Sequence, residues 1–107
     1  MQKTQLVNLF FYVPESHLEQ VKTAVFKAGA GNIGNYSHCC WQVKGQGQFK
    51  PLDNSDAFIG KQNQLNHIEE YRVEIVLPRA SLDKVRTALL NAHPYEEVAY
   101  GFTEILL

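Results

Sequence analysis

Hydrophobic residues gather in two short runs that have the composition of β-strands. The first, "LVNLFFYV", covers residues 6–13, and the second, "YRVEIVL", covers residues 71–77. Both runs are rich in β-branched and aromatic side chains, which favour strands, and a proline follows each of them. We therefore predict one strand over each run.

Each predicted strand leads into a segment whose apolar residues recur at helical spacing. The segment "VPESHLEQVKTAVFKAGA" is repeated later in the chain as "LPRASLDKVRTALLNAHP". In the first copy Leu18, Val21 and Val25 fall on one face of a helix. Ser16 and Ser81 stand near the two helix starts, where a hydroxyl can cap free N–H groups. The repeat predicts two equivalent amphipathic helices.

A further strand is predicted after each helix, "YSHCCWQV" over residues 36–43 and "EVAYGFTEIL" over residues 97–106. The resulting order is βαββαβ. Two such units, joined by right-handed crossovers, combine into a four-stranded antiparallel sheet with both helices on one face. We therefore predict an α+β, ferredoxin-like fold, and the 107 residues suit a single domain over positions 1–107.

The predicted strand over residues 6–13 carries apolar side chains on both of its faces. Leu9 and Phe11 fall on one side, whereas Phe10 and Tyr12 fall on the other. A face of an antiparallel sheet that meets water is expected to be polar. Because an extended apolar patch usually marks an interface, we expect the protein to form a homo-oligomer.

The segment 45–70, "GQGQFKPLDNSDAFIGKQNQLNHIEE", is polar and is interrupted by glycine, proline, asparagine and aspartate. We predict a long connection between two strands. Connections longer than about 12 to 15 residues are uncommon in compact domains and are usually functional or disordered. Phe49, Phe58 and Ile59 give this segment apolar groups with which it can dock on the rest of the domain.

The balance of charge argues against several classes of partner. Lysine and arginine number 10 and aspartate and glutamate 11, and neither sign forms a long block, so we expect no nucleic-acid and no membrane partner. No run approaches the roughly 18 apolar residues of a spanning helix. Cys39 and Cys40 are adjacent and poorly placed to bond to each other, which indicates free thiols. We expect a soluble, cytoplasmic protein.

One candidate metal site lies in the stretch 36–43. His38 and Cys40 stand two positions apart, so on a strand their side chains face the same way. An imidazole and a thiolate could begin a soft-metal site, completed by His67, by His93 or by a neighbouring subunit. The alternative is an inert buried cysteine and a hydrogen-bonded histidine. The other face of this strand is predicted to join the core through Cys39, Trp41 and Val43.

A second candidate site lies in "NAHPYEEVAY", residues 91–100. His93, Tyr95, Glu96 and Glu97 bring together an imidazole, a phenol and two carboxylates, which could contact a ligand, hold a divalent ion or act as a base. The alternative is structural. Proline stops the second helix, and His93 caps its C-terminal end, where the helix dipole stabilises a positive charge by roughly 0.3 to 1 kcal/mol.

Two glycine-containing stretches invite comparison with phosphate loops. "GAGNIGNY", residues 29–36, follows a helix and leads into a strand, the reverse of a phosphate loop. Gly29 and Gly31 are therefore predicted to end the helix in the left-handed conformation. "GQGQF", residues 45–49, is a weak phosphate signal on its own.

Three blocks, "GAGNIGNYSHCCWQVKGQGQFKP", "IEEYRVEIVLP" and "AHPYEEVAY", resemble in the same order the inserted domain of the Ngg-interacting-factor-three family. Bacterial members of that family are often labelled GTP cyclohydrolase type 2. The inserted domain is similar in fold to the PII signalling proteins and the CutA proteins, both trimers. The resemblance therefore implies a PII/CutA-like fold, here as a stand-alone chain, and a homotrimer.

The resemblance also bears on ligands. PII proteins bind nucleotides at the loop after the second strand and in the grooves between subunits, which implies that Gly45, Gly47 and Phe49 line such a cleft. The larger part of the Ngg-interacting-factor-three proteins carries a dinuclear metal centre built from histidine pairs and acidic ligands. This chain has four histidines, and none is adjacent to another. We therefore expect no catalytic residues.

The function expected is that of a binding or regulatory module that responds to a small molecule or a metal. Its ligand is unknown, and a divalent metal is one option. We expect the site where the stretch 45–49 approaches the HPYEE turn. Two alternatives stay open, a protein-interaction module that docks a partner through the segment 45–70, and a metal-dependent hydrolase related to GTP cyclohydrolase type 2 that would use His93.

Overall fold

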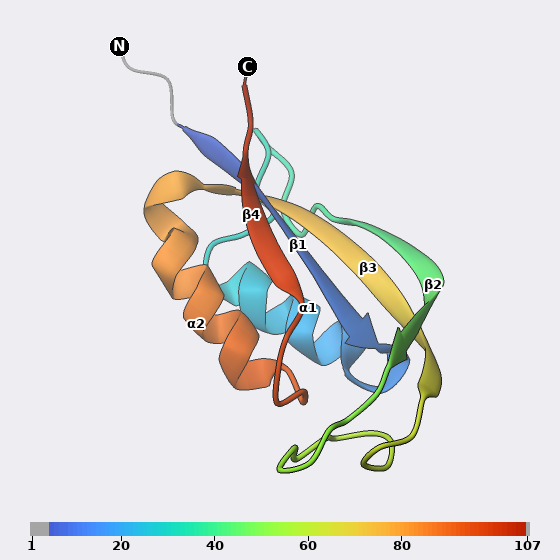
Figure 1. Cartoon of the computed structure of the whole chain (residues 1–107). Coiled ribbons are helices and arrows are strands. Elements are labelled where there is room, and N and C mark those ends of the chain that lie inside the picture. Colours follow the sequence, from blue (N-terminus) through green and yellow to red (C-terminus); the bar gives the residue numbers. More distant parts are fainter. Residues whose placement is uncertain (1–4, 107) are drawn as a thin grey trace.

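A computed structural model describes residues 5–106 of the chain (Figure 1). A short 3-10 turn leads into each α-helix, η1 (Glu15–His17) before the first and η2 (Arg79–Ser81) before the second. The main elements follow in the order β1 (Leu6–Pro14), α1 (Leu18–Lys27), β2 (Trp41–Phe49), β3 (Asn66–Pro78), α2 (Leu82–Ala92) and β4 (Tyr100–Glu104).

The strands form one four-stranded sheet in the order β2-β3-β1-β4, and every neighbouring pair is antiparallel. Figure 1 shows both helices packed on the same face of this sheet. The predicted ferredoxin-like α+β fold is therefore confirmed. Among the residues that the structure describes, no helix is long and apolar enough to cross a membrane.

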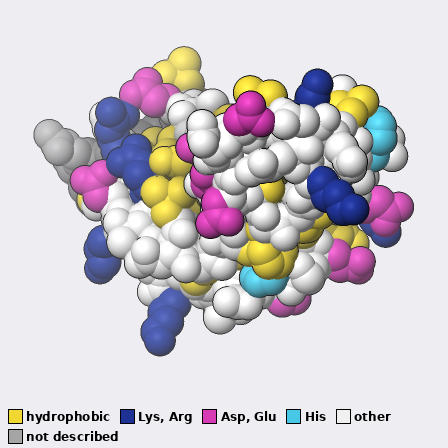
Figure 2. Space-filling view, turned by 60° about the horizontal axis from the view of Figure 1, so that its bottom comes forward, with side chains coloured by type: hydrophobic (Ala, Val, Ile, Leu, Met, Phe, Trp, Pro, Cys, Tyr) yellow, Lys and Arg dark blue, Asp and Glu magenta, His cyan; other side chains and the backbone are white. Residues whose placement is uncertain are grey.

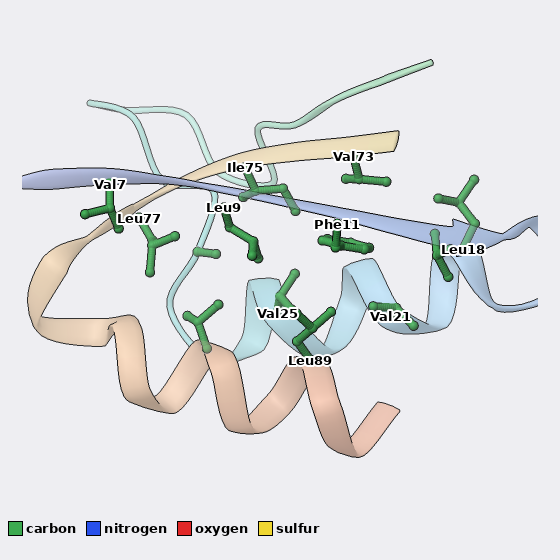
Figure 3. Close-up of a cluster of buried hydrophobic side chains, with 13 residues drawn as sticks. Val7, Leu9, Phe11, Leu18, Val21, Val25, Val73, Ile75, Leu77 and Leu89 are labelled. Carbon is green, nitrogen blue, oxygen red and sulfur yellow. The ribbon is translucent and has the colours of Figure 1, made fainter. Parts of the chain in front are cut away.

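The hydrophobic core lies between the sheet and the helices (Figure 3). Alternate residues of β1 point into it, so Leu9 and Phe11 are buried while Phe10 and Tyr12 are only partly covered. Burying one such side chain fully contributes roughly 1.5 to 3 kcal/mol. The largest fully buried side chains among the described residues are Leu9, Phe11, Val13, Val21, Val25, Val73, Ile75, Leu77, Val85 and Leu89.

Both α-helices begin without the predicted serine caps. Pro14 and Pro78 end β1 and β3 with φ of -69° and -65°, and a 3-10 turn follows each. The Ser16 hydroxyl lies 2.9 Å from Nδ1 of His17, and Ser81 occupies the N-cap position of α2 without making a side-chain cap hydrogen bond. Because proline fixes φ, the chain turns into each helix without such a bond. The predicted placement of the serines near the helix starts is confirmed, with Ser81 at the N-cap position, but neither hydroxyl caps a free N–H group.

Gly29 and Gly31 end the first helix as predicted. Their φ angles are +118° and +88°, values that residues with a side chain rarely adopt. At position 31 the backbone also passes close to a ring, because a Cβ there would lie 2.7 Å from Cδ1 of Phe26. The Gly31 N–H donates to the carbonyl oxygen of Val76 at 2.8 Å, which fixes this turn against β3.

The strand predicted over residues 36–43 begins only at Trp41. Ile33 and Tyr36 exchange two backbone hydrogen bonds of 2.9 Å that close a tight turn, and His38 has a φ of +59°. Backbone groups that are paired within a turn are not free to join a sheet. The placement of His38 on a strand is therefore wrong.

The predicted connection over residues 45–70 is wrong at both ends. β2 continues to Phe49 and β3 begins at Asn66, so the connection comprises only residues 50–65, which we call the hairpin loop. β1 pairs with β3 only from Glu70 onward. Residues 66–69 of β3 therefore extend beyond β1 and pair with β2 alone. Because this pairing uses backbone groups, a stretch rich in glycine and glutamine can form it.

The face of the sheet opposite the helices carries several apolar residues. Trp41 and Val43, which were predicted to be core, are 56% and 44% exposed. Their pairing partners on β3 pair in turn with Phe10 and Tyr12, so all four side chains share this face. Cys39 lies before β2 and is partly exposed. We call the surface formed by Phe10, Tyr12, Trp41 and Val43 the open face.

Candidate functional site

A pocket of about 540 Å³ lies at the end of the β2–β3 hairpin, between the hairpin loop and the turn that follows α2. Figure 2 views the molecule from this end, where hydrophobic and acidic side chains lie close together on the surface. Apolar walls come mainly from Phe49, Leu52, Phe58, Ile59 and Ile68. The lining also includes side chains with polar groups, those of Tyr12, Lys50, Asp53, Ser55, Glu70, Tyr95, Glu96 and Glu97.

The hairpin loop is attached to the body of the domain by two kinds of contact. The Phe58 ring lies between the rings of His17 and Tyr95, with centroid distances of 5.3 and 6.4 Å. The Asp56 N–H donates a hydrogen bond of 2.7 Å to Oε2 of Glu96. The loop therefore forms one wall of the pocket, and the turn after α2 forms the facing wall.

Hydrogen bonds within the hairpin loop maintain its shape. Nδ2 of Asn63 donates to Oδ1 of Asp53 at 2.7 Å, and Nε2 of Gln62 donates to the Ser55 carbonyl at 3.1 Å. Asn54 and Asn63 adopt φ of +70° and +61°, a region that asparagine tolerates better than most residues. Residues far apart in the loop thus hold one another in place.

His93 ends α2 as predicted, and its side chain is only 6% exposed. Its Nε2 lies 2.7 Å from the Tyr12 carbonyl, and its Nδ1 lies 3.1 Å from the Tyr95 backbone nitrogen. A carbonyl oxygen only accepts and an N–H only donates, so Nε2 carries the proton and Nδ1 accepts. The ring is therefore neutral.

Burial lowers the pKa of His93, against the smaller raising effect of the Tyr12 carbonyl, and the neighbouring His17 lowers it further. The predicted cap with a positive charge is wrong, because the buried ring does not gain enough from the helix dipole to ionise. With both nitrogens bonded to backbone, His93 positions the backbone of Tyr95 and does not line the pocket.

Tyr95 and Glu70 form the polar floor of the pocket. The hydroxyl of Tyr95 is buried and has no hydrogen-bond partner of regular geometry among residues 5–106. Burial, and then the negative charge of Glu70, raise the pKa of Tyr95 to about 12. Burial also raises the pKa of Glu70, while the nearby Tyr95 hydroxyl lowers it. The Tyr95 hydroxyl and the Glu70 carboxylate are thus held close together where both are partly shielded from water.

Gly47 leaves the space that Glu70 occupies. A Cβ at position 47 would collide with the Glu70 carboxylate, whereas one at Gly45 would meet no atom within 4 Å. Neither glycine lines the pocket. Among the ligand-binding residues predicted from the sequence, the structure brings Phe49 together with Tyr95, Glu96 and Glu97, while Gly45, Gly47 and His93 lie outside the lining.

The predicted metal residues are not gathered in one place. The His38 ring packs edge-on against Phe26 at 5.0 Å, and Cys40 is exposed. His93 is bound near the far end of β1, at Tyr12. Within residues 5–106, no group of three histidine, cysteine, aspartate or glutamate side chains is arranged to hold a metal ion.

Sequence reasoning missed Glu70 and Ser55. The alternation of side chains along residues 66–78 places Ile68 and Glu70 on one face, and that signal was available once the strand was known to begin at Asn66. Ser55 has no comparable signal, because the shape of the hairpin loop places it at the pocket.

Comparison with protein-family models found no match for the chain. It is 45% identical over 95 residues to a protein of Halalkalibacterium halodurans named GTP cyclohydrolase 1 type 2 homolog, and 47% identical over 95 residues to the protein of the same name in Bacillus subtilis. Each match covers 89% of this chain and 26% of the relative. The chain thus spans about a quarter of the length of these relatives.

Among solved structures, a Bacillus cereus protein related to NIF3 superposes with a TM-score of 0.83 and 38% identity, over 98% of this chain and 27% of that one. CutA from Synechococcus elongatus gives 0.69 and 17%, over 99% and 81% of the two chains. The Bacillus subtilis GlnK–ATP complex gives 0.64 and 14%, over 98% and 85%. The last two likenesses show a common fold, which confirms the predicted PII/CutA-like architecture.

Proposed function

Because this chain is related in sequence and fold to one domain of the Ngg-interacting-factor-three family, we propose that it is a non-catalytic binding and regulatory module whose small-molecule ligand occupies the pocket at the hairpin end. The main observation in support of this proposal is the pocket itself. Its volume of about 540 Å³ falls within the range of sites for small organic molecules, roughly 300 to 1,000 Å³. Its apolar walls and few converging polar groups are also typical of such sites.

The side chains at the pocket support binding rather than catalysis. Both nitrogens of His93 are engaged by backbone groups, so this ring is not available as a base. Tyr95, with a pKa raised to about 12, stays protonated at neutral pH. The activity in the names of the relatives belongs to proteins of which this chain spans 26%, and we do not extend it to this domain.

A regulatory role is supported by the way the hairpin loop closes the pocket. The loop is attached through Phe58 and through the bond from Asp56 to Glu96, and the pocket lies directly beneath it. A ligand that contacts both walls would hold the loop in this docked position. Ligand binding would then change the surface of the hairpin loop. A partner protein that binds this surface would respond to the ligand, which connects the binding function with the alternative of protein interaction through the same segment.

Self-association through the open face is the second part of the proposal. Trp41 and Val43 are about half exposed there, beside the partly covered rings of Phe10 and Tyr12. An apolar patch of this kind on a small domain usually marks an interface. We propose the homotrimer that the resemblance to PII and CutA proteins implies.

The binding function is tested by thermal melting of the purified protein against nucleotides, divalent metal chlorides, and small organic acids and amines. At 100 times its Kd a ligand stabilises the folded state by about 2.7 kcal/mol, which shifts Tm by several degrees in a domain of this size. Phe58→Ala should abolish the shift. The control Leu90→Ala, at a similarly exposed site on α2, should retain it. A screen in which no compound shifts the wild-type protein would argue against the proposal.

A further inference from the structure

We propose that the pocket at the hairpin end is built for a small organic cation, an ammonium or amidinium group attached to an apolar or aromatic body. This inference rests on the proposed binding function and assigns the chemical class of the ligand. The charges, the buried hydroxyl groups and the apolar walls of the pocket support it separately.

The charges on the pocket wall are mostly negative. Four carboxylates line it, those of Asp53, Glu70, Glu96 and Glu97, against the single ammonium group of Lys50. None of the four takes part in an ion pair with another side chain of residues 5–106. Their field therefore attracts a cation and opposes a phosphate group.

Glu70 is the carboxylate with the most to gain from a cation. It is the least exposed of the four, and burial raises its pKa because the charged form has lost part of its hydration. Glu96 already accepts a hydrogen bond from the Asp56 N–H, and Asp53 accepts one from Asn63. A positive group beside Glu70 would replace the missing hydration.

Two buried hydroxyl groups line the same pocket. Oγ of Ser55 has no hydrogen-bond partner among residues 5–106, and Oη of Tyr95 makes none of regular geometry, although it lies close enough to Glu70 to stabilise that carboxylate. Buried polar groups in folded proteins are normally paired. Ionised carboxylates only accept hydrogen bonds, and hydroxyl groups can accept as well as donate them, so a ligand group with several N–H donors can bond to all of these groups at once.

The remaining walls suit an organic cation better than a bare metal ion. Phe49, Leu52, Phe58 and Ile68 form an apolar surface next to the carboxylates. The aromatic ring of Tyr95 also borders the pocket, and aromatic faces attract organic cations. A metal ion would occupy little of the 540 Å³ and would leave these walls uncovered.

A nucleotide fits this lining poorly. Phosphate sites use arginine or lysine side chains, commonly together with clusters of free backbone N–H groups. Here Lys50 is exposed at the rim, and the Asp56 N–H is already bonded to Glu96. The GlnK–ATP complex shares only the fold with this chain, and the fold does not determine the charge of a ligand.

The experiment is isothermal titration calorimetry of the full chain with probes matched in shape and opposite in charge. Phenethylamine is paired with 3-phenylpropionate, benzamidine with benzoate, and ATP is added as an anionic nucleotide. We expect the amine and the amidine to bind at least tenfold more tightly than their carboxylate partners and than ATP. Raising the salt concentration should weaken cation binding.

Two variants test the site directly. Glu70→Gln and Glu97→Gln should each weaken binding of the cations about tenfold or more. The matched control is Glu69→Gln, which removes the same charge from the same strand on the other face of the sheet, where Glu69 pairs with Lys44. Glu97 is exposed, so its variant keeps the test decisive even if a change at Glu70 affects folding.

The outcomes separate this inference from the function on which it rests. If a carboxylate or ATP binds more tightly than the cations and Phe58→Ala removes that binding, the pocket binds ligands but the assigned charge is wrong. If the cations bind equally well to wild type, Glu70→Gln and Glu97→Gln, the inference is overturned. If no probe of either charge binds, the inference is overturned, whereas the proposed function fails only if the wider melting screen also finds no ligand.

Discussion

At the scale of single residues, His93 shows how the fold sets a protonation state. The ring is held between the Tyr12 carbonyl and the Tyr95 N–H, and only the neutral form satisfies both. The sequence places a histidine at a helix end, which favours a positive charge. Burial outweighs that preference because charging a buried ring removes its hydration.

The state of His93 predicts a pH dependence of stability. Its pKa is lowered in the folded state, so near the ordinary value of 6.5 the unfolded chain binds more protons than the folded one. The free energy of unfolding should therefore be highest above that value and fall as the pH is lowered through it. Urea unfolding at pH 7.5 and pH 5.5 measures the difference.

His93→Gln should reduce this pH dependence, and it should also cost about 1 to 3 kcal/mol because a buried hydrogen-bonding group is left without its partner. The control is His67→Gln at an exposed position on β3. That variant should keep the wild-type pH dependence. An unchanged pH dependence in the His93 variant would mean that another group is responsible.

Gly47 makes a second prediction at this scale. Gly47→Ala should displace the Glu70 carboxylate and destabilise the protein by about 1 kcal/mol, because the added methyl group overlaps the end of that side chain, which can shift. Gly45→Ala, two residues earlier on the same strand, meets open space and should lie within about 0.5 kcal/mol of wild type. Chemical denaturation of both variants measures the contrast, and equal effects would show that the collision is not the cause.

At the scale of elements, the β2–β3 hairpin is where sequence and structure differ most. Hydrophobic alternation predicted a strand over residues 36–43, and glycine content predicted a loop over 45–49. Local turns keep the backbone of residues 36–40 out of the sheet, while the long β3 pairs with residues 41–49. Side-chain preferences predict strands poorly here, because the hydrogen bonds between strands are formed by backbone groups. The partner strand of a segment is decided only by the tertiary structure.

The attachment of the hairpin loop gives a prediction for this element. Glu96→Ala removes the acceptor of the Asp56 N–H and should raise the rate of hydrogen exchange at Asp56 and its neighbours about tenfold, which corresponds to a local loss of about 1.4 kcal/mol. Exchange in the core strand β1 should stay as in wild type. Glu97→Ala, which removes an adjacent carboxylate that makes no such bond, is the control, and equal exchange in both variants would show that the bond does not hold the loop.

At the scale of the whole molecule, the sheet has one face covered by helices and one face without cover. The open face contains Trp41 and Val43, and the guanidinium of Arg72 lies 4.6 Å from the centre of the Phe10 ring on the same side. A second copy of the chain that packed on the open face would remove the exposed Trp41 side chain from water. This is the physical basis for proposing self-association.

Trp41→Glu should convert the proposed trimer to monomer, because a charge buried in an apolar interface has no partner. Light scattering coupled to size-exclusion chromatography gives the mass directly. Leu90→Glu, which introduces the same charge at a 43% exposed position on α2, should leave the mass unchanged. A wild-type protein that elutes as a monomer would contradict the proposal, as would a trimer that survives Trp41→Glu.

The sequence by itself determined the two strand–helix units and the helix end at His93. Local spacing and composition are sufficient for these features, because each depends on residues close together in the chain. The tertiary structure alone decided that Glu70 and Ser55 share a pocket with Tyr95, that Gly47 makes room for a carboxylate, and that His93 is neutral. Each of these depends on register or burial between distant segments, as in the bond from His93 to Tyr12, 81 positions apart.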